Sequence, residues 1–158
     1  MKEVNITVPH YKKLVLRHIV LDYNGTLAED GELKEEARDL LDPLVERYSV
    51  HVITSDTFGS VKAQLEGFNV TVKVLTSDDH TAEKAAYIDA LGCVHCAAVG
   101  NGNNDAKMLK EAGLGIALIG DEGCSTETLL NSDVVCSSIK DALGLLLNEK
   151  RLIATLRK

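Results

Sequence analysis

Four short segments of the chain carry residue types that together could transfer a phosphoryl group. They are the run Asp22-Tyr23-Asn24-Gly25-Thr26, the run Thr54-Ser55-Asp56, an isolated Lys84, and the run Gly100-Asn101-Gly102-Asn103-Asn104-Asp105. The first run offers a carboxylate, which can attack phosphorus and bind a metal. The others offer a hydroxyl and an ammonium for phosphoryl oxygens, and a Gly-rich turn that ends in a second acid. Their combination indicates one phosphoryl-transfer site.

The run from Gly100 to Asp105 is the most specific of the four. It lies between a predicted buried strand and a predicted helix, so its amides and Asn side chains would be aimed at the helix N-terminus. A polar hairpin turn fits this run poorly, because a helix follows it. Asp22 and Lys84 are ambiguous when each is taken alone. Asp22 could cap a turn at a strand end, and Lys84 could lie on a solvated helix face.

Apolar runs of strand length alternate with helical patterns along most of the chain. Strands are predicted over residues 14–21, 50–54, 70–75, 97–100, 114–119 and 133–136, and helices over 32–48, 60–65, 81–91, 105–112 and 139–147. Pro43 is expected to kink or break the first helix. Val4, Ile6 and Val8 alternate with polar residues and predict an N-terminal strand that pairs with the next one as an edge hairpin. The pattern predicts an α/β fold with a parallel, doubly wound sheet covered on both faces.

In a sheet of this kind, the chemistry lies beyond the carboxyl ends of the strands. Asp22, Thr54 and the turn that begins at Gly100 all occupy such positions in the predicted fold. We therefore expect Asp22, Thr54, Lys84 and Asp105 to converge on one crevice at the carboxyl edge of the sheet.

The four segments, in this order, resemble the haloacid dehalogenase (HAD) superfamily. They match its DxxGT nucleophile loop, a strand-end Thr, a Lys and a GDGxND-like turn, and the match runs from about Ile19 to Val135. The run Thr54-Ser55-Asp56-Thr57 also resembles the TGDN element of P-type ATPases. The resemblance is therefore greatest to the phosphorylation domain of those pumps and to small soluble HAD phosphatases built like it. It implies a three-layer, HAD-like Rossmannoid fold.

The resemblance also implies a role for each matched residue. Asp22 would be the nucleophile that forms an aspartyl-phosphate, with Asn24, Thr54 and Lys84 as the other catalytic positions. The implied phosphate ligands are Thr54, Ser55, Lys84 and Asn104. The family cofactor is Mg²⁺, and its implied ligands are Asp22, the main-chain carbonyl of Asn24, Asn101 and Asp105.

Two residues depart from the family pattern. Family phosphatases carry at the position of Asn24 an Asp that protonates the leaving group and then activates water. An amide cannot exchange that proton, and general acid–base catalysis contributes about 10²–10⁴-fold, so slow turnover is expected. Asn101 stands where the family usually has a metal-binding Asp. Its amide oxygen can still bind Mg²⁺, but without a charge, so the affinity should fall.

The spacing of the motifs leaves no room for the cap domain that many HAD enzymes insert. Between Asp22 and Val52 there is space for one helix, and between Thr54 and Lys84 for a single helix–strand unit. Capless members of the family commonly act on macromolecular substrates or close the site with a neighbouring subunit. The resemblance therefore implies a phosphorylated substrate, with a macromolecule or a homo-oligomer covering the open site.

The composition is that of an ordinary globular protein. A length of 158 residues predicts a single domain over residues 1–158. A net charge of -7 disfavours nonspecific binding to nucleic acid or anionic membrane. We expect no membrane helix and no signal peptide, and hence a cytoplasmic location. Cys93 and Cys96 have CxxC spacing, which a redox or metal site could use. Free thiols are the main interpretation, and a redox or metal role is the alternative.

Three functions fit these features to different degrees. The first is a Mg²⁺-dependent phosphohydrolase that is slow for its family. The second is a binding or regulatory module that kept the fold and lost turnover through Asn24 and Asn101. The third, a response-regulator-like receiver, is disfavoured because receivers are shorter and lack the DxxGT and GxGxND turns.

Overall fold

A six-stranded parallel sheet forms the centre of the molecule. The computed structural model describes residues 2–56 and 59–158. The strands of the sheet are β3 (His18–Asp22), β6 (Ser49–Thr54), β7 (Thr71–Val74), β8 (Cys96–Gly100), β9 (Leu114–Leu118) and β10 (Val134–Cys136). Their order is β10-β9-β8-β3-β6-β7, and every neighbouring pair is parallel. The predicted parallel, doubly wound sheet is confirmed.

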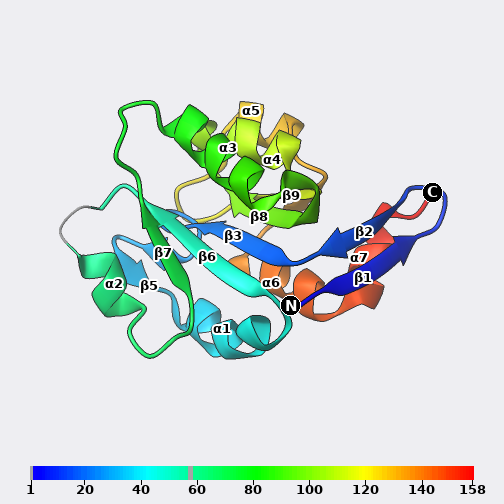
Figure 1. Cartoon of the computed structure of the whole chain (residues 1–158), viewed down its shortest axis with the longest axis horizontal. Coiled ribbons are helices and arrows are strands. Elements are labelled where there is room, and N and C mark those ends of the chain that lie inside the picture. The colour runs from blue at the N-terminus through cyan, green and yellow to red at the C-terminus, as the bar shows by residue number, and fades with distance from the viewer. Residues whose placement is uncertain (1, 57–58) are drawn as a thin grey trace.

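Helices cover both faces of this sheet, which gives the predicted three layers (Figure 1). The helices are α1 (Glu35–Arg47), α2 (Ser60–Gln64), α3 (His80–Leu91), α4 (Ala106–Glu111), α5 (Thr126–Leu130), α6 (Ile139–Leu147) and α7 (Glu149–Leu156). Neighbouring residues of β3 point to opposite faces. Ile19 and Leu21 pack into one apolar core with residues of α1 and α6, and Val20 packs into a second core with Ile88 of α3 and Met108 of α4.

The N-terminal hairpin differs from the prediction. Strands β1 (Val4–Val8) and β2 (Lys12–Leu16) pair antiparallel, but they form a sheet of their own and not an edge of the central sheet. The predicted strand over 14–21 is in fact two strands that meet at Arg17. The neighbours of β3 begin opposite His18, at Ser49 and Cys96, so residues 12–16 find no partner strand in the central sheet. They pair with β1 instead, beyond the end of the sheet (Figure 1).

The first helix was also predicted with wrong limits. A short hairpin of β4 (Ala28–Glu29) and β5 (Glu32–Leu33) occupies the expected start of the helix. Asp30 and Gly31 connect its strands with positive φ values of 51° and 85°, as a two-residue hairpin turn requires. Helix α1 then runs through Pro43 without a break. Pro43 has no N–H to donate to the carbonyl of Asp39, which is an exposed residue of the helix.

Two further helices, α5 and α7, were not predicted, and α7 packs against β1. Cys93, Cys96, Cys124 and Cys136 are all free thiols. Among the described residues, no helix combines the length and the apolar character that crossing a membrane requires.

Candidate active site

The candidate site lies where the strand order of the central sheet changes direction. From β3 the chain builds outward through β6 and β7 on one side, and later through β8, β9 and β10 on the other. Asp22 ends β3, and Gly100 ends the adjacent β8. Ligands of open α/β sheets bind at such a switch point, outside the carboxyl ends of the strands.

A pocket of about 210 Å³ opens at this edge of the sheet. Seven predicted site residues line it: Asp22, Asn24, Ser55, Lys84, Asn101, Asn104 and Asp105. Its other lining residues are Leu75, His80, Gly102 and Glu122. Segments that are far apart in the sequence thus meet in one cavity.

Lys84 is the central cation of the pocket. Its Nζ donates to Asp22 Oδ1 at 3.0 Å, to Asn104 Oδ1 at 2.8 Å and to Asp105 Oδ1 at 2.7 Å. Burial lowers the pKa of Lys84, but Asp22 and Asp105 outweigh that effect and raise the pKa above its ordinary value. Lys84 therefore stays charged although it is only 2% exposed.

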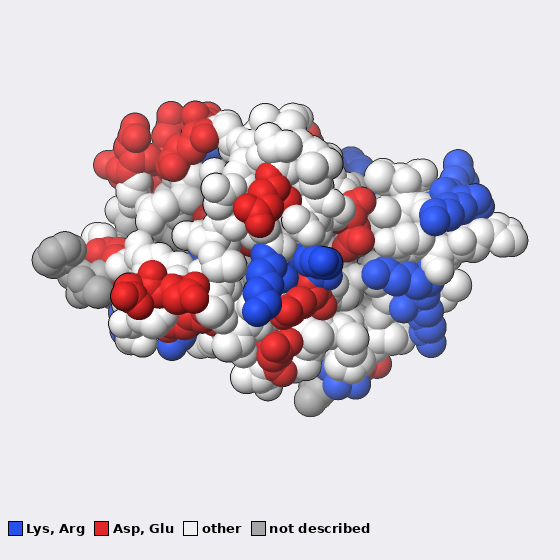
Figure 2. All heavy atoms as spheres, turned by 90° about the horizontal axis from the view of Figure 1, so that it is seen from above, with Lys and Arg blue, Asp and Glu red and all other residues white. Residues whose placement is uncertain are grey.

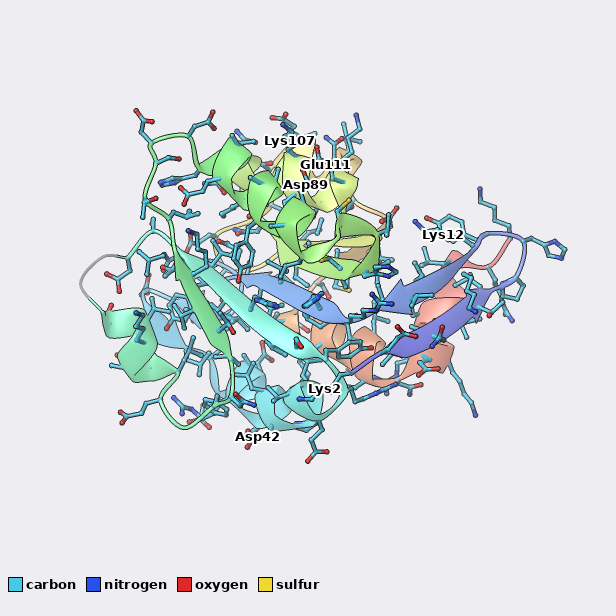
Figure 3. The ribbon with its side chains drawn as sticks, in the orientation of Figure 1. Lys2, Lys12, Asp42, Asp89, Lys107 and Glu111 are labelled. Carbon is cyan, nitrogen blue, oxygen red and sulfur yellow. The ribbon has the colours of Figure 1, made fainter. Side chains whose placement is uncertain are left out.

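The position of Lys84 follows from the start of helix α3. Asp79 caps this helix, because its side chain accepts a hydrogen bond from the backbone N–H of Ala82 at 3.1 Å. Lys84 then falls on the buried side of α3. Asp89 of the same helix is exposed and lies with Lys107 of α4 on the outer side of the helical layer (Figure 3). The ambiguous lysine of the sequence is thus a buried part of the pocket.

Asp105 organises the Gly/Asn-rich turn. Its Oδ1 accepts from Lys84, and its Oδ2 accepts from the backbone N–H groups of Asn101 and Gly102, both at 3.1 Å. A Cβ at Gly100 would lie 2.4 Å from Asp105 Cγ, so glycine is required there. Both oxygens of Asp105 are therefore engaged in holding the turn and the lysine.

Asp22 lies beside this network on the floor of the pocket. It is 8% exposed, and its Oδ2 accepts from the Thr26 hydroxyl at 3.4 Å. Burial and the neighbouring charge of Asp105 raise the pKa of Asp22 to about 7, although Lys84 and Thr26 act in the opposite direction. Gly25, at a φ of 78°, lets the chain turn directly after the strand. A cation bound in the pocket would therefore stabilise the charged form of Asp22.

The donor set of the pocket fits Mg²⁺. The predicted ligands offer only oxygen atoms, from the carboxylates of Asp22 and Asp105, the Asn24 carbonyl and the Asn101 amide. A Cβ at Gly25 would lie 2.7 Å from Asn101 Nδ2, so the two loops that carry Asn24 and Asn101 touch. Within residues 2–56 and 59–158, no group of three His, Cys, Asp or Glu side chains is placed to hold a metal. Mg²⁺ suits such a site, because it commonly keeps several waters and uses one or two carboxylates.

Thr54 and Ser55 are placed differently from each other at the end of β6. Thr54 is 2% exposed, and its hydroxyl accepts from the backbone N–H of Asp56 at 3.0 Å. It is not among the residues that line the pocket, whereas the exposed Ser55 is. The predicted element of four residues ends at Thr57, which lies outside the described residues.

His80 and Glu122 line the pocket but were missed in the sequence. Neither belongs to a recognisable motif: His80 begins α3, and Glu122 follows β9 in the loop before α5. Their positions near the carboxyl ends of β7 and β9 could have indicated both.

Charges are unevenly spread over the rest of the surface. On the face shown in Figure 2, Lys and Arg gather at the hairpin end and acidic residues at the opposite end.

Comparisons with known proteins were made with both the sequence and the structure. No family model matches the chain. One uncharacterized protein of Methanocaldococcus jannaschii is 62% identical over 60 residues, which are 38% of this chain and 64% of that protein. A second from the same organism is 44% identical over 39 residues, which are 25% of this chain and 89% of that protein. The chain thus spans just under two thirds of the first relative's length.

Solved structures match nearly the whole chain. A 3-deoxy-D-manno-octulosonate (KDO) 8-phosphate phosphatase of Moraxella catarrhalis, in complex with magnesium, phosphate and KDO, matches with a TM-score of 0.70 and 20% identity, over 90% of this chain and 94% of that one. The cobalt-bound phosphatase of Haemophilus influenzae matches with a TM-score of 0.68 and 12% identity, over 87% and 88%.

A proposed HAD superfamily (subfamily III A) hydrolase of Legionella pneumophila matches with a TM-score of 0.65 and 16% identity, over 89% of this chain and 88% of that one. None of these matches bears specifically on P-type ATPases, so that part of the resemblance stays a prediction. The sheet order, the three layers and these matches agree, and the chain has the fold of the HAD superfamily phosphatases.

Proposed function

We propose that this protein is a Mg²⁺-dependent phosphohydrolase that works through an aspartyl-phosphate at Asp22. The observation that carries the proposal is the buried ion-pair network in which Lys84 joins Asp22 to Asp105 at the switch point of the sheet. A network of this kind costs desolvation energy, so its burial beside an open pocket points to a chemical role. The fold shared with KDO 8-phosphate phosphatases agrees with this assignment.

In the proposed reaction, a carboxylate oxygen of Asp22 attacks the phosphorus of the substrate. The bond from phosphorus to the leaving oxygen breaks, and that oxygen departs with the electron pair and takes a proton from solvent. Water then hydrolyses the acyl-phosphate, which releases inorganic phosphate and regenerates Asp22. Lys84 would orient the Asp22 carboxylate and neutralise charge on the phosphoryl oxygens. The side-chain oxygen of Asn104 accepts from Lys84, and its amide nitrogen could donate to the phosphoryl group. Bound Mg²⁺, held by Asp22, the Asn24 carbonyl, Asn101 and Asp105, would neutralise the remaining charge. Ser55, which lines the pocket, is a further proposed phosphate ligand, and Thr54, which does not line it, would need its hydroxyl to turn into the pocket to serve as one.

Turnover is proposed to be slow. Asn24 is exposed on the rim of the pocket, where an acid could exchange protons with the leaving group and with water. Its amide can hydrogen-bond there but cannot carry the proton. The same feature supports the second candidate, a regulatory module that binds phosphorylated ligands without turning them over.

The pocket limits the part of the substrate that can enter it. A volume of about 210 Å³ holds a phosphoryl group and a few further atoms, because small-molecule sites usually measure about 300–1,000 Å³. The leaving group would therefore lie outside the pocket, either as part of a macromolecular substrate or beneath a second copy of this chain. We propose one of these two as the cover of the site.

The test is an assay of freshly purified protein with Mg²⁺ and an aryl phosphate. We expect slow hydrolysis that Asp22→Asn abolishes while the fold, followed by circular dichroism, stays intact. Full activity in that variant would place the nucleophile elsewhere. Asn24 and Asn101 each precede a glycine, a context that favours deamidation to an acid, so mass spectrometry of both peptides must accompany the assay. Activity that tracks deamidation would support the regulatory module for the encoded sequence.

A further inference from the structure

A third carboxylate lines the pocket, and no motif supplies it. Asp22 and Asp105 are buried and both are paired with Lys84. Glu122, in contrast, is exposed and lies in the loop between β9 and α5. It lines the same pocket as Asp22 but stands outside that ion-pair network. This places an acid at the mouth of the pocket, above the buried pair on its floor.

The loop that carries Glu122 is fixed to the catalytic loops. Gly120 and Gly123 bond to each other through their backbones, at 2.9 and 3.3 Å, and close a turn with Glu122 at its tip. The Asn101 side chain donates to the Gly123 carbonyl at 3.4 Å, and the Asn101 carbonyl accepts from the Ser125 N–H at 2.8 Å. The position of Glu122 relative to Asn101 is therefore set by two hydrogen bonds to the residues that follow it, Gly123 and Ser125.

The same turn runs beside the nucleophile loop. A Cβ at Gly120 would lie 3.0 Å from the carbonyl oxygen of Gly25, the residue directly after Asn24. Asn24 is the position at which the resembled phosphatases carry their proton-exchanging acid. The turn thus brings Glu122 to the side of the pocket where such an acid is missing.

We propose that Glu122 is the general base for hydrolysis of the aspartyl-phosphate, an inference that rests on the proposed function of Asp22. A water oxygen attacks phosphorus, and the bond from phosphorus to the Asp22 oxygen breaks. Its electron pair returns to the Asp22 carboxylate, and the proton of the water moves to Glu122. The products are inorganic phosphate, ionised Asp22 and protonated Glu122, which then releases its proton to solvent.

The direction of attack selects Glu122 over the other acids. In an in-line displacement the water approaches opposite to the bond that breaks. Because Asp22 is buried on the floor, the water arrives from the mouth, where Glu122 is exposed. Asp105 is unsuited to this role, since it is fully buried, is paired with Lys84 and is itself a proposed Mg²⁺ ligand.

His80 is the other titratable residue on the rim. It begins helix α3 and also lines a neighbouring pocket with Asp78, Asp79 and Asn104. It therefore lies on the Asn104 side of the site. The contacts of the Gly120–Gly123 turn with Gly25 and Asn101 place Glu122 on the Asn24 side, so the geometry favours Glu122 as the base.

The experiment separates formation of the phosphoenzyme from its hydrolysis. Full-length protein with Mg²⁺ is mixed rapidly with an aryl phosphate, quenched in acid and analysed by intact-protein mass spectrometry. Glu122→Gln should form the phosphoenzyme at close to the wild-type rate, hydrolyse it about 10²-fold or more slowly, and therefore accumulate it. The matched control is Asp121→Asn, on the same turn, where Asp121 pairs with Lys34 at 2.6 Å in a different pocket. This control should behave like the wild type.

A second variant tests the proton-carrying role directly. Adding Asn24→Asp to Glu122→Gln should restore hydrolysis, because it places a proton carrier on the same side of the pocket. The inference is overturned if Glu122→Gln hydrolyses its phosphoenzyme at the wild-type rate, or if it loses phosphorylation as well and accumulates nothing. Accumulation in His80→Gln but not in Glu122→Gln would assign the base to His80 instead. If wild-type protein forms no phosphoenzyme at all, the proposed function itself fails and this inference with it.

Discussion

Asp22→Asn should stabilise the metal-free protein at neutral and alkaline pH, although it removes the proposed nucleophile. Asp22 is buried next to Asp105, and these two effects raise its pKa from 3.8 to about 7. Ionising Asp22 in the folded protein is therefore unfavourable. The substituted amide is neutral at every pH, has nearly the same shape, and can still accept a hydrogen bond from Lys84.

The size and sign of the effect follow from the pKa difference between the two states. The unfolded chain ionises Asp22 near 3.8 and the folded chain near 7, so wild-type stability is lost as the pH rises through this window. At about 1.4 kcal/mol per pKa unit, the full difference is about 4 kcal/mol. The amide accepts less well from Lys84 and loses the bond from Thr26, which offsets about 1–2 kcal/mol. The net gain at about pH 8 should thus be roughly 2–3 kcal/mol.

Denaturant unfolding in EDTA, at about pH 5 and about pH 8, measures this gain. The free energy of unfolding of the variant should exceed that of the wild type by roughly 2–3 kcal/mol at the higher pH, and the difference should shrink at the lower pH. Equal stability of the two proteins at the higher pH, or a difference that does not change with pH, would refute the argument. An unchanged m-value is required for either conclusion.

Three further changes test other parts of the structure. Asn24→Asp should raise turnover about 10²-fold or more by restoring a proton carrier; no gain, with Mg²⁺ binding verified by calorimetry, would favour the regulatory module. Gly100→Ala should abolish activity, because a Cβ there would lie 2.4 Å from Asp105 Cγ. The control Gly102→Ala, whose Cβ has its nearest contact at 3.8 Å, should stay active. Equal activities of the two variants would contradict the role given to Asp105. Burial lowers the pKa of His51 to about 4, so wild-type stability should fall by up to about 3 kcal/mol as the pH falls from 6.5 to about 4. In urea titrations, His51→Gln should flatten this dependence of stability on pH. An unchanged dependence would be inconsistent with a neutral buried imidazole.

The fold was largely predictable because the inner strands of its sheet are buried on both faces. Continuous apolar runs such as Ile19 to Leu21 and Ala97 to Val99 are distinctive of parallel sheets. The limits of the elements were less predictable, because they depend on partners. Arg17 marks a break in a run that looks continuous, since the neighbours of β3 start only at His18. The Asp30-Gly31 turn, in contrast, was a readable hairpin signal.

The candidate site was predictable to the extent that its residues lie at strand ends. Asp22 and the turn from Gly100 follow from that rule. The burial of Lys84 could not be deduced, because the helix face it occupies is set by the cap at Asp79 and by packing against the sheet. Glu122 reaches the pocket through the contacts of its turn with Asn101 and Gly25, tertiary contacts that have no local signature in the sequence.

The most direct test of the central claim is to locate the phosphoryl group on the protein. Fresh protein is incubated with Mg²⁺ and acetyl phosphate, quenched in acid, digested and mapped by mass spectrometry. The account predicts one phosphoryl group, on the peptide that carries Asp22, and none in Asp22→Asn. A phosphoryl group on another residue, or steady hydrolysis that persists undiminished in Asp22→Asn, would contradict it.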